Sequence, residues 1–429
     1  MANESLTSKP IAAPFEWLAG GLFFGKSKGG IESIDSCKDV SSLLKGIEEN
    51  LADISAGGAP AYSNANTSSA TTVPAERQPE GNSTLTAPSQ FLAARIARLR
   101  FLLYDERRLS SQQESCWSTP AVAAAVLKGL TSTPLLELMP NLLEHMCALP
   151  FESRKHVTAV FAYLLVSGLD GSDAALYLPI MEDFRSYVEA EYDRLMHIIV
   201  SGHDVAKHGA SDVCLHYGTM YRSFLRHPSL YQLLVGTTAR AERYVYPFLD
   251  SYVHLPNFEV SSDAMESLRL VFTAGGDRVG TEASQPMADL VADFFTRDYV
   301  AIFDERFNPK LLSDTANYMT RRVALQILST LLLTRSNYNV MIQYVASREN
   351  LMLVMKLLRD NSPHITWDAF HVFKVFVANP NKPQEVIKIL RDNQVKLCRY
   401  LTTLHQDKEE NDTQFRDEKA LIITTIEAL

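Results

Sequence analysis

The sequence predicts an all-α protein, an armadillo/HEAT-like helical-repeat solenoid (a horseshoe of stacked helices) with a disordered insertion near the N-terminus. Three observations support this fold class. From Phe91 onward the apolar residues follow a helical period, and no alternating stretch is long enough for a strand. Similar apolar helices recur along the chain, and one of them, over 364–378, is apolar on almost every side.

The chain divides into three predicted parts. Residues 1–54 are an N-terminal extension with a first short helix over 31–54. Residues 55–90 are rich in Gly, Pro, Ser, Thr and Asn, and they have too little apolar surface to compensate for the entropy of ordering. We therefore expect a disordered insertion there, followed by a helical-repeat domain over 91–429. A shorter loop is expected near 274–286.

Recurrence along the repeat domain indicates a solenoid. Each recurring segment places a small residue near the start of an apolar helix, and the segments are 152–168, 204–227, 258–273, 317–333 and 364–378. Ala210, Ala264, Ala324 and Ala369 are the candidate equivalent positions. Units of roughly 40–47 residues with two or three helices are typical of HEAT and armadillo proteins. An irregular helical bundle is the alternative.

The helix over 364–378 shows why the helices must be stacked. Ser362 and Pro363 supply an N-cap followed by proline at the first helical position. Only His371 and Lys374 form a polar strip. The remaining circumference is mostly apolar and includes Phe370, Val372, Phe373, Val375, Phe376 and Val377. Such a helix has to be buried on two sides, which a layered stack provides.

Composition restricts the function classes. The 429 residues carry a net charge of −9, which argues against nucleic acid and anionic membrane surfaces as partners. The five cysteines are scattered without a CxxC pair, so we expect reduced thiols, no disulfide frame and no zinc site. No apolar run is long enough to span a membrane. We expect a cytoplasmic protein without membrane insertion.

Motifs for catalysis or cofactor binding are absent or unconvincing. Residues 20–27 match the P-loop pattern GxxxxGK[ST], but Leu22, Phe23 and Phe24 crowd the loop and no βα units follow. The acidic stretch 407–412 lacks the ligand pattern of a calcium loop, so a solvated, charged connection is expected. We therefore predict no enzyme activity, no cofactor and no metal.

A polar line on the helix predicted over 318–333 points to protein recognition. Arg322, Gln326 and Ser329 follow the spacing i, i+4, i+7, so they share one face; a plain solvent-exposed stripe is the alternative. Successive lines of this kind pave the binding face of a solenoid. Arg335 and Tyr338 follow at the C-terminal end of this helix and form a pair of types enriched at interface hot spots.

Met355, flanked by Leu351 and Leu358, is a candidate lining residue for an apolar pocket beside Arg322. Methionine more often fills a core than serves a site, so a core position is the alternative.

The C-terminal block resembles the calcium-binding protein 39 family of armadillo-like kinase scaffolds. The resemblance is strongest over 317–429 and peaks in AFHVFKVFVANPNK at 369–382. It also includes NYMTRR at 317–322, ENLML at 349–353 and LLRD at 357–360. Upstream it weakens, residues 91–200 match poorly, and residues 1–20 and 55–90 are additions to the family pattern.

The resemblance implies a horseshoe without catalytic activity that holds a sterile-twenty-type protein kinase or adaptor pseudokinase in its active conformation. By position, Arg322 and Met355 correspond to the family's pocket for a Trp-Glu-Phe-type tail. Arg335 and Tyr338 correspond to its concave, kinase-contacting arginine and phenylalanine, and we add Gln326 to that face. The expected assembly is a monomer within a heteromeric complex.

Overall fold

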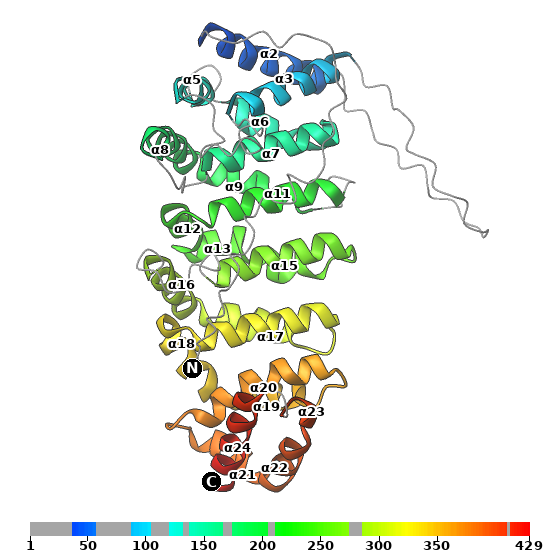
Figure 1. Cartoon of the computed structure of the whole chain (residues 1–429), viewed down its shortest axis with the longest axis vertical. Helices are drawn as coiled ribbons and strands as arrows, with labels where there is room; N and C mark the ends of the chain where they lie inside the picture. The colour runs from blue at the N-terminus through cyan, green and yellow to red at the C-terminus, as the bar shows by residue number, and fades with distance from the viewer. Residues whose placement is uncertain are drawn as a thin grey trace, which may run out of the picture.

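The computed structural model describes residues 37–56, 87–103, 120–131, 137–165, 174–204, 211–273, 285–409 and 412–429. These described residues form helices and short connections and contain no strand. The helical units follow one another along one long axis, from α2 (Cys37–Ala56) at one end to α24 (Thr413–Glu427) at the other (Figure 1). The all-α helical-repeat solenoid predicted from the sequence is confirmed.

One helix of each unit stacks directly on its equivalent in the next unit, and we call these the ladder helices. Figure 1 shows several of them crossing the molecule one below another. In chain order they are α3 (Ala87–Leu103), α7 (Phe151–Leu165), α11 (Ser211–Phe224), α15 (Phe258–Phe272), α17 (Tyr318–Leu333), α20 (Pro363–Ala378) and α24.

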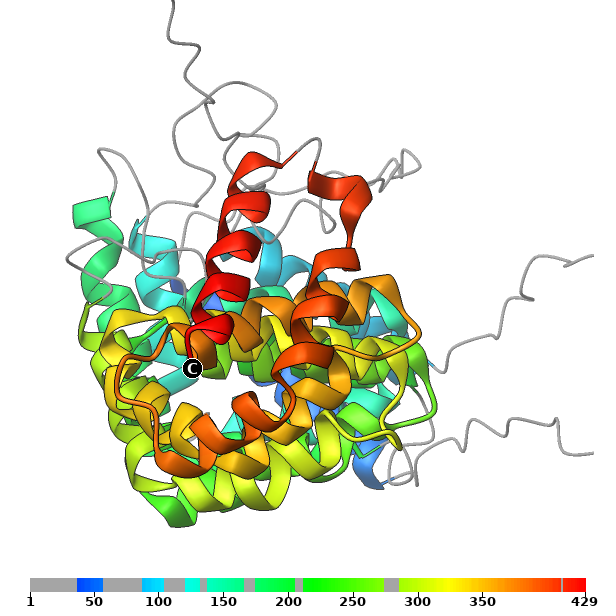
Figure 2. The same cartoon turned by 90° about the horizontal axis from the view of Figure 1, so that it is seen from below.

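Further helices complete the units between the ladder helices, and the view along the stack shows successive units one behind another (Figure 2). They are α5 (Pro120–Thr131), α6 (Leu138–Glu144), α8 (Ala174–Ala190), α9 (Tyr192–Ser201), α12 (Pro228–Val235), α13 (Thr238–Tyr244), α14 (Tyr246–Asp250), α16 (Gln285–Arg297), α18 (Tyr338–Ala346), α19 (Arg348–Leu357), α21 (Gln384–Asp392), α22 (Gln394–Thr403) and α23 (Gln406–Glu409). The segment η5 (Val300–Leu311) is a π-helix, and the 3₁₀ turns are η2 (Met146–Ala148), η3 (Tyr252–His254) and η6 (Arg335–Asn337).

The N-terminal predictions are only partly covered by the described residues. The first helix, expected over 31–54, is α2. Most of the expected disordered insertion, 57–86, lies outside the described residues, and α3 already begins at Ala87. The insertion and the three-part division of the chain therefore stay predictions.

The helix α20 matches its prediction closely. The Ser362 hydroxyl accepts a hydrogen bond from the Ile365 amide at 3.5 Å, and proline follows at the start of the helix. Phe370, Phe373 and Phe376 are fully buried, because α20 lies between α17 on one side and α24 on the other. The helix is thus an interior layer of the stack.

Small residues allow the ladder helices to approach. Ala264, Ala324 and Ala369 are fully buried at equivalent positions of α15, α17 and α20. Ala210, the fourth candidate, lies outside the described residues. In α11 it is Gly218 that meets the next ladder helix, since a Cβ atom at this position would collide with the carboxylate of Asp263. Spacing alone could not identify the residue that makes this contact.

Polar side chains tie most consecutive ladder helices together. A basic residue on one helix reaches a polar or acidic residue on the next, in the pairs Arg100–His156, Arg154–Asp212, Arg222–Asp263, Arg322–Asp368 and Lys374–Glu418. Half-buried pairs of this kind fix the register between stacked helices, because an uncompensated partner would be costly to leave behind.

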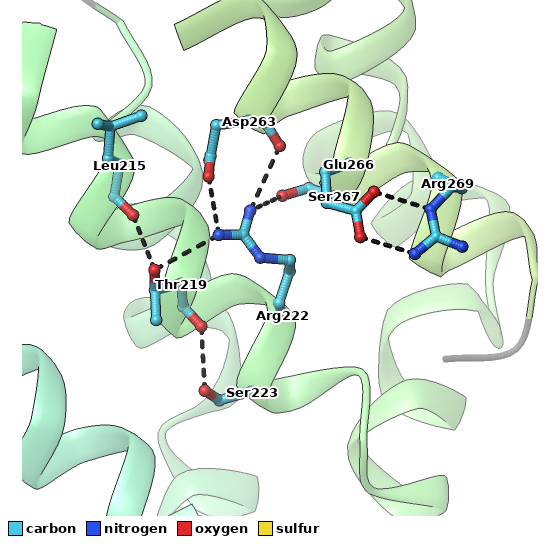
Figure 3. A network of polar contacts seen from close by, with 8 residues as sticks. All are labelled: Leu215, Thr219, Arg222, Ser223, Asp263, Glu266, Ser267 and Arg269. Atoms are coloured by element: carbon cyan, nitrogen blue, oxygen red, sulfur yellow. Dashed lines mark hydrogen bonds and ion pairs between the residues drawn. The ribbon is translucent and has the colours of Figure 1, made fainter. Parts of the chain in front are cut away.

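The tie between α11 and α15 is the most elaborate of these (Figure 3). The Arg222 guanidinium lies 2.7 Å from Asp263 Oδ1 and donates to the Ser267 hydroxyl at 3.0 Å. It also donates to the Asp263 carbonyl at 3.3 Å and to Thr219 at 3.4 Å. One arginine of α11 therefore holds side-chain and backbone acceptors of α15 in a fixed position.

Three of the buried histidines in the N-terminal half of the stack have a strongly lowered pKa. Burial lowers the pKa of His156, His203 and His216 from 6.5 to about 4 in each case. His203 packs against Phe248 and Tyr252, with ring centroids 4.9 and 5.3 Å away. These histidines are neutral, structural components of the core.

We expect Gly218→Ala to destabilise the fold. The added methyl group pushes Asp263 away from Arg222, which should lower the free energy of unfolding by about 1–3 kcal/mol. Urea denaturation measures the change, and Ser262→Ala at an exposed position of α15 is the control. Equal stability of the two variants would contradict the close approach of α11 and α15.

Stability should also fall as the pH drops from 7.5 to 5. The folded pKa of the three histidines is below the unfolded value, so below about pH 6.5 the unfolded state binds protons that the folded state does not. Each histidine then destabilises the fold by roughly 1–2 kcal/mol at pH 5. Urea denaturation of wild type and His203→Gln at both pH values isolates one contribution. An identical pH-dependent loss in both proteins would refute the assignment.

Candidate functional site

The polar line predicted on α17 has the expected arrangement. The Asn317 side chain caps the helix by accepting from the Thr320 amide at 2.8 Å. One side of the helix is buried through Ala324, Leu325, Ile327, Leu328, Leu331 and Leu332. On the other side Arg322 and Ser329 are half-buried and Gln326 is exposed. The three residues therefore share an accessible face.

Arg322 and Gln326 converge on one carboxylate of the next ladder helix. Asp368 Oδ2 lies 3.5 Å from Arg322 Nε and 3.3 Å from the Gln326 amide nitrogen. Both contacts are long. Burial raises the pKa of Asp368, and the charge of Arg322 opposes this shift. Asp368 is thus a mostly buried carboxylate whose two polar partners, Arg322 and Gln326, are both at long distance.

Arg322 differs from its neighbour Arg321 in how fully its guanidinium is used. Arg321 lies 2.5 Å from Asp360, at a largely buried position. Arg322 makes only the long contact to Asp368 within the described residues, and its side chain is more exposed. A guanidinium offers five donors, so Arg322 has capacity left for a carboxylate from outside the chain.

A cavity of about 950 Å³ lies near the C-terminal end of the stack, beside α19 and α22. Its apolar lining contains Met355 together with Leu357, Leu358, Ile389 and Leu397. Its charged lining residues are the basic Lys356, Arg359 and Lys396 and the acidic Asp314 and Asp360. Asp314 pairs with Lys356, and Asp360 pairs with Arg321. The Tyr400 hydroxyl closes one side by donating to the Leu358 carbonyl. A cavity whose lining holds apolar side chains and more basic than acidic ones suits a segment that carries aromatic and acidic side chains.

The structure separates two residues that the sequence analysis grouped. Met355 lines the cavity, whereas Arg322 is not among the lining residues and instead faces Asp368. The sequence analysis missed the basic residues that line the cavity. Lys356 and Arg359 look like ordinary surface residues in the sequence, and Lys396 belongs to a helix further along the chain. No spacing rule brings these residues to one cavity.

Arg335 and Tyr338 lie where the chain turns from α17 into α18. The buried Asn337 side chain holds this turn by donating to the Leu331 carbonyl at 3.1 Å. Arg335 is exposed, and Tyr338 and Leu333 keep 58% and 60% of their surface accessible. The sequence analysis missed Leu333, which is apolar and reads as core from periodicity alone. We call Leu333, Arg335 and Tyr338 the turn patch.

Two further predictions concern the P-loop-like residues and the acidic stretch near the C-terminus. The P-loop-like residues 20–27 lie outside the described residues. The stretch 407–412 is more than a solvated connection, because Glu409 pairs with the buried Lys419 and the Asp412 side chain caps α24. Lys419 also donates to the Leu404 carbonyl at 2.7 Å.

The described residues hold no cluster of three or more His, Cys, Asp or Glu placed to bind a metal ion. No described helix is both long and apolar enough to cross a membrane.

Comparison with known proteins covers most of the chain. Residues 89–429 match the family model described as Mo25-like, so the match includes the region 91–200 in which the resemblance had looked weak. A putative MO25-like protein of Arabidopsis thaliana is 33% identical over 335 residues, which is 78% of this chain and 84% of that protein.

The calcium-binding protein 39-like protein of Homo sapiens is 32% identical over 292 residues, covering 68% of this chain and 76% of that protein. The Mo25-like protein of Schizosaccharomyces pombe is 33% identical and covers 67% and 76%. None of these relatives is named as an enzyme. A designed armadillo repeat protein aligns with a TM-score of 0.36 and 13% identity, over 67% of this chain and 99% of that one. By the match over 89–429 and these relatives, the chain belongs to the Mo25-like family.

Proposed function

We propose that this protein is a non-catalytic scaffold that binds a sterile-twenty-type protein kinase or pseudokinase and stabilises its active conformation. Membership of the Mo25-like family implies a scaffold function. The observation that carries the proposal is the cavity around Met355, whose lining combines apolar side chains with three basic and two acidic ones.

The cavity is the proposed site for a Trp-Glu-Phe-type tail of the partner. Aromatic side chains would bury against Met355, Ile389 and Leu397, where they displace water from apolar surface. Lys396 and Arg359 would face the glutamate or a terminal carboxylate. Arg322 lies outside this lining, so we assign it to a partner carboxylate on the exposed side of α17.

The second proposed contact is the turn patch together with Gln326. An exposed arginine beside an exposed tyrosine and leucine offers the hydrogen bonds and apolar area typical of interface hot spots. Activation requires that this surface bind the active kinase conformation more tightly than the inactive one. The alternative is a structural or localisation adaptor that binds partners without stimulating a kinase.

Met355→Ala should weaken binding of a Trp-Glu-Phe tail peptide about ten-fold or more, because it removes apolar surface at the cavity. Arg322→Ala should also weaken it, because a carboxylate of the peptide loses its guanidinium partner on α17. Fluorescence anisotropy with a labelled peptide measures both affinities, and the melting temperatures should stay nearly unchanged.

Leu421→Ala and Arg348→Ala, at exposed positions of α24 and α19, are the matched controls for this experiment. Unchanged affinity in Met355→Ala would contradict the cavity assignment. Unchanged affinity in Arg322→Ala alone would remove α17 from the tail site.

Arg335→Ala combined with Tyr338→Ala should reduce stimulation of the partner kinase at least about ten-fold, because both hot-spot side chains are lost. The measurement is the kinase rate with and without the scaffold, at fixed kinase concentration. The tail peptide should still bind this variant. Full stimulation would show that another surface is used, and a wild-type protein that binds without any stimulation would favour the adaptor alternative.

A further inference from the structure

The junction between α15 and α17 lacks the polar tie found at the other junctions of the ladder. Arg222 links α11 to α15, and Arg322 and Gln326 link α17 to α20. Among the described residues, which include the whole of both helices, no hydrogen bond or ion pair joins α15 to α17. The sequence explains this, because α17 contains no acidic residue and its arginines bind Asp360 and Asp368.

A cleft replaces the missing contacts. It has a volume of about 520 Å³ and is lined by the N-terminal halves of both helices and the segments that precede them. Apolar side chains dominate the lining, and Phe258, Met319 and Tyr318 remain 64%, 42% and 37% exposed. Ala264 of α15 and Ala324 of α17 are buried, but along the cleft the two helices make few contacts with each other. Helices with few packed side chains between them can move at lower free-energy cost.

The same junction is fixed on its other sides. Between α14 and η5, the Asp250 carboxylate accepts from Lys310 at 2.6 Å and lies 3.2 Å from Arg306. Near α12, Arg297 donates to the Val235 carbonyl at 2.7 Å.

Rings also close the far end of α15, where Phe272 packs against Phe295 and Phe307 with centroids 5.0 and 5.9 Å away. A junction that is held along two sides and open along the third can act as a hinge.

We propose that the solenoid bends at this junction, with the cleft between α15 and α17 opening and closing. The moving bodies are the units up to α15 and the units from α17 to α24. Arg322, the turn patch and the cavity around Met355 all belong to the second body. Bending therefore changes their position relative to the ladder face formed by α7, α11 and α15. This inference does not depend on the identity of the partner.

Distance measurements between spin labels test the hinge in the full chain. Labels are attached to a genetically encoded ketone side chain, so the native cysteines stay unmodified. Glu152 on α7 and His364 on α20 are exposed and span the cleft, roughly 40 Å apart if each step along the ladder is about 10 Å. Glu152 with Glu259 reports on the first body, and Thr330 with Gln414, on α17 and α24, reports on the second.

We expect the distance distribution across the cleft to be at least about twice as broad as either distribution within a body. Equal widths would overturn the hinge. Val323 lines the cleft, so Val323→Phe should fill it and narrow the distribution across it. Val395→Phe, at a highly exposed position of α22, should leave the distribution broad. A width unaffected by Val323→Phe, in a protein with a normal melting curve, would show that the cleft is not the hinge.

Discussion

The close approach of consecutive ladder helices is the constraint on which the rest of the structure depends. Each helix between two others must bury both sides, so it needs small residues where backbones meet and large apolar residues where they diverge. Ala264, Ala324 and Ala369 meet the first demand, and Phe370, Phe373 and Phe376 of α20 meet the second. In α11, the space beside Gly218 accommodates the carboxylate of Asp263, which Arg222 then holds.

The proposed binding surfaces are what this stacking leaves uncovered. The buried side of α17 is committed to its neighbours, so Arg322 and Gln326 can only face outward. The buried Asn337 holds the turn that exposes Arg335 and Tyr338. Rigid helices thus present the polar line and the turn patch at fixed positions. Such preorganisation lowers the entropy lost when a partner binds.

Not every junction of the ladder is equally firm, and the differences follow from where charges fall in the sequence. Complementary charges face each other across α11 and α15 and across α17 and α20. Between α15 and α17 they do not, and the unit that contains this junction also holds the π-helix η5 with Pro309 inside it. An irregular helix and an untied ladder pair in one unit distinguish it from its neighbours, whose ladder helices are tied.

The sequence by itself determined the fold class, the buried face and N-cap of α20, the small-residue positions of three ladder helices and the polar line of α17. These follow from helical periodicity and local capping, which act over a few residues. Only the tertiary structure decided that Met355 lines the cavity while Arg322 faces Asp368, that Lys396 joins Arg359 at one cavity, and that Leu333 is exposed. These outcomes depend on how separate helices are rotated and spaced in the stack. Packing over the whole stack sets that geometry, and no local pattern encodes it.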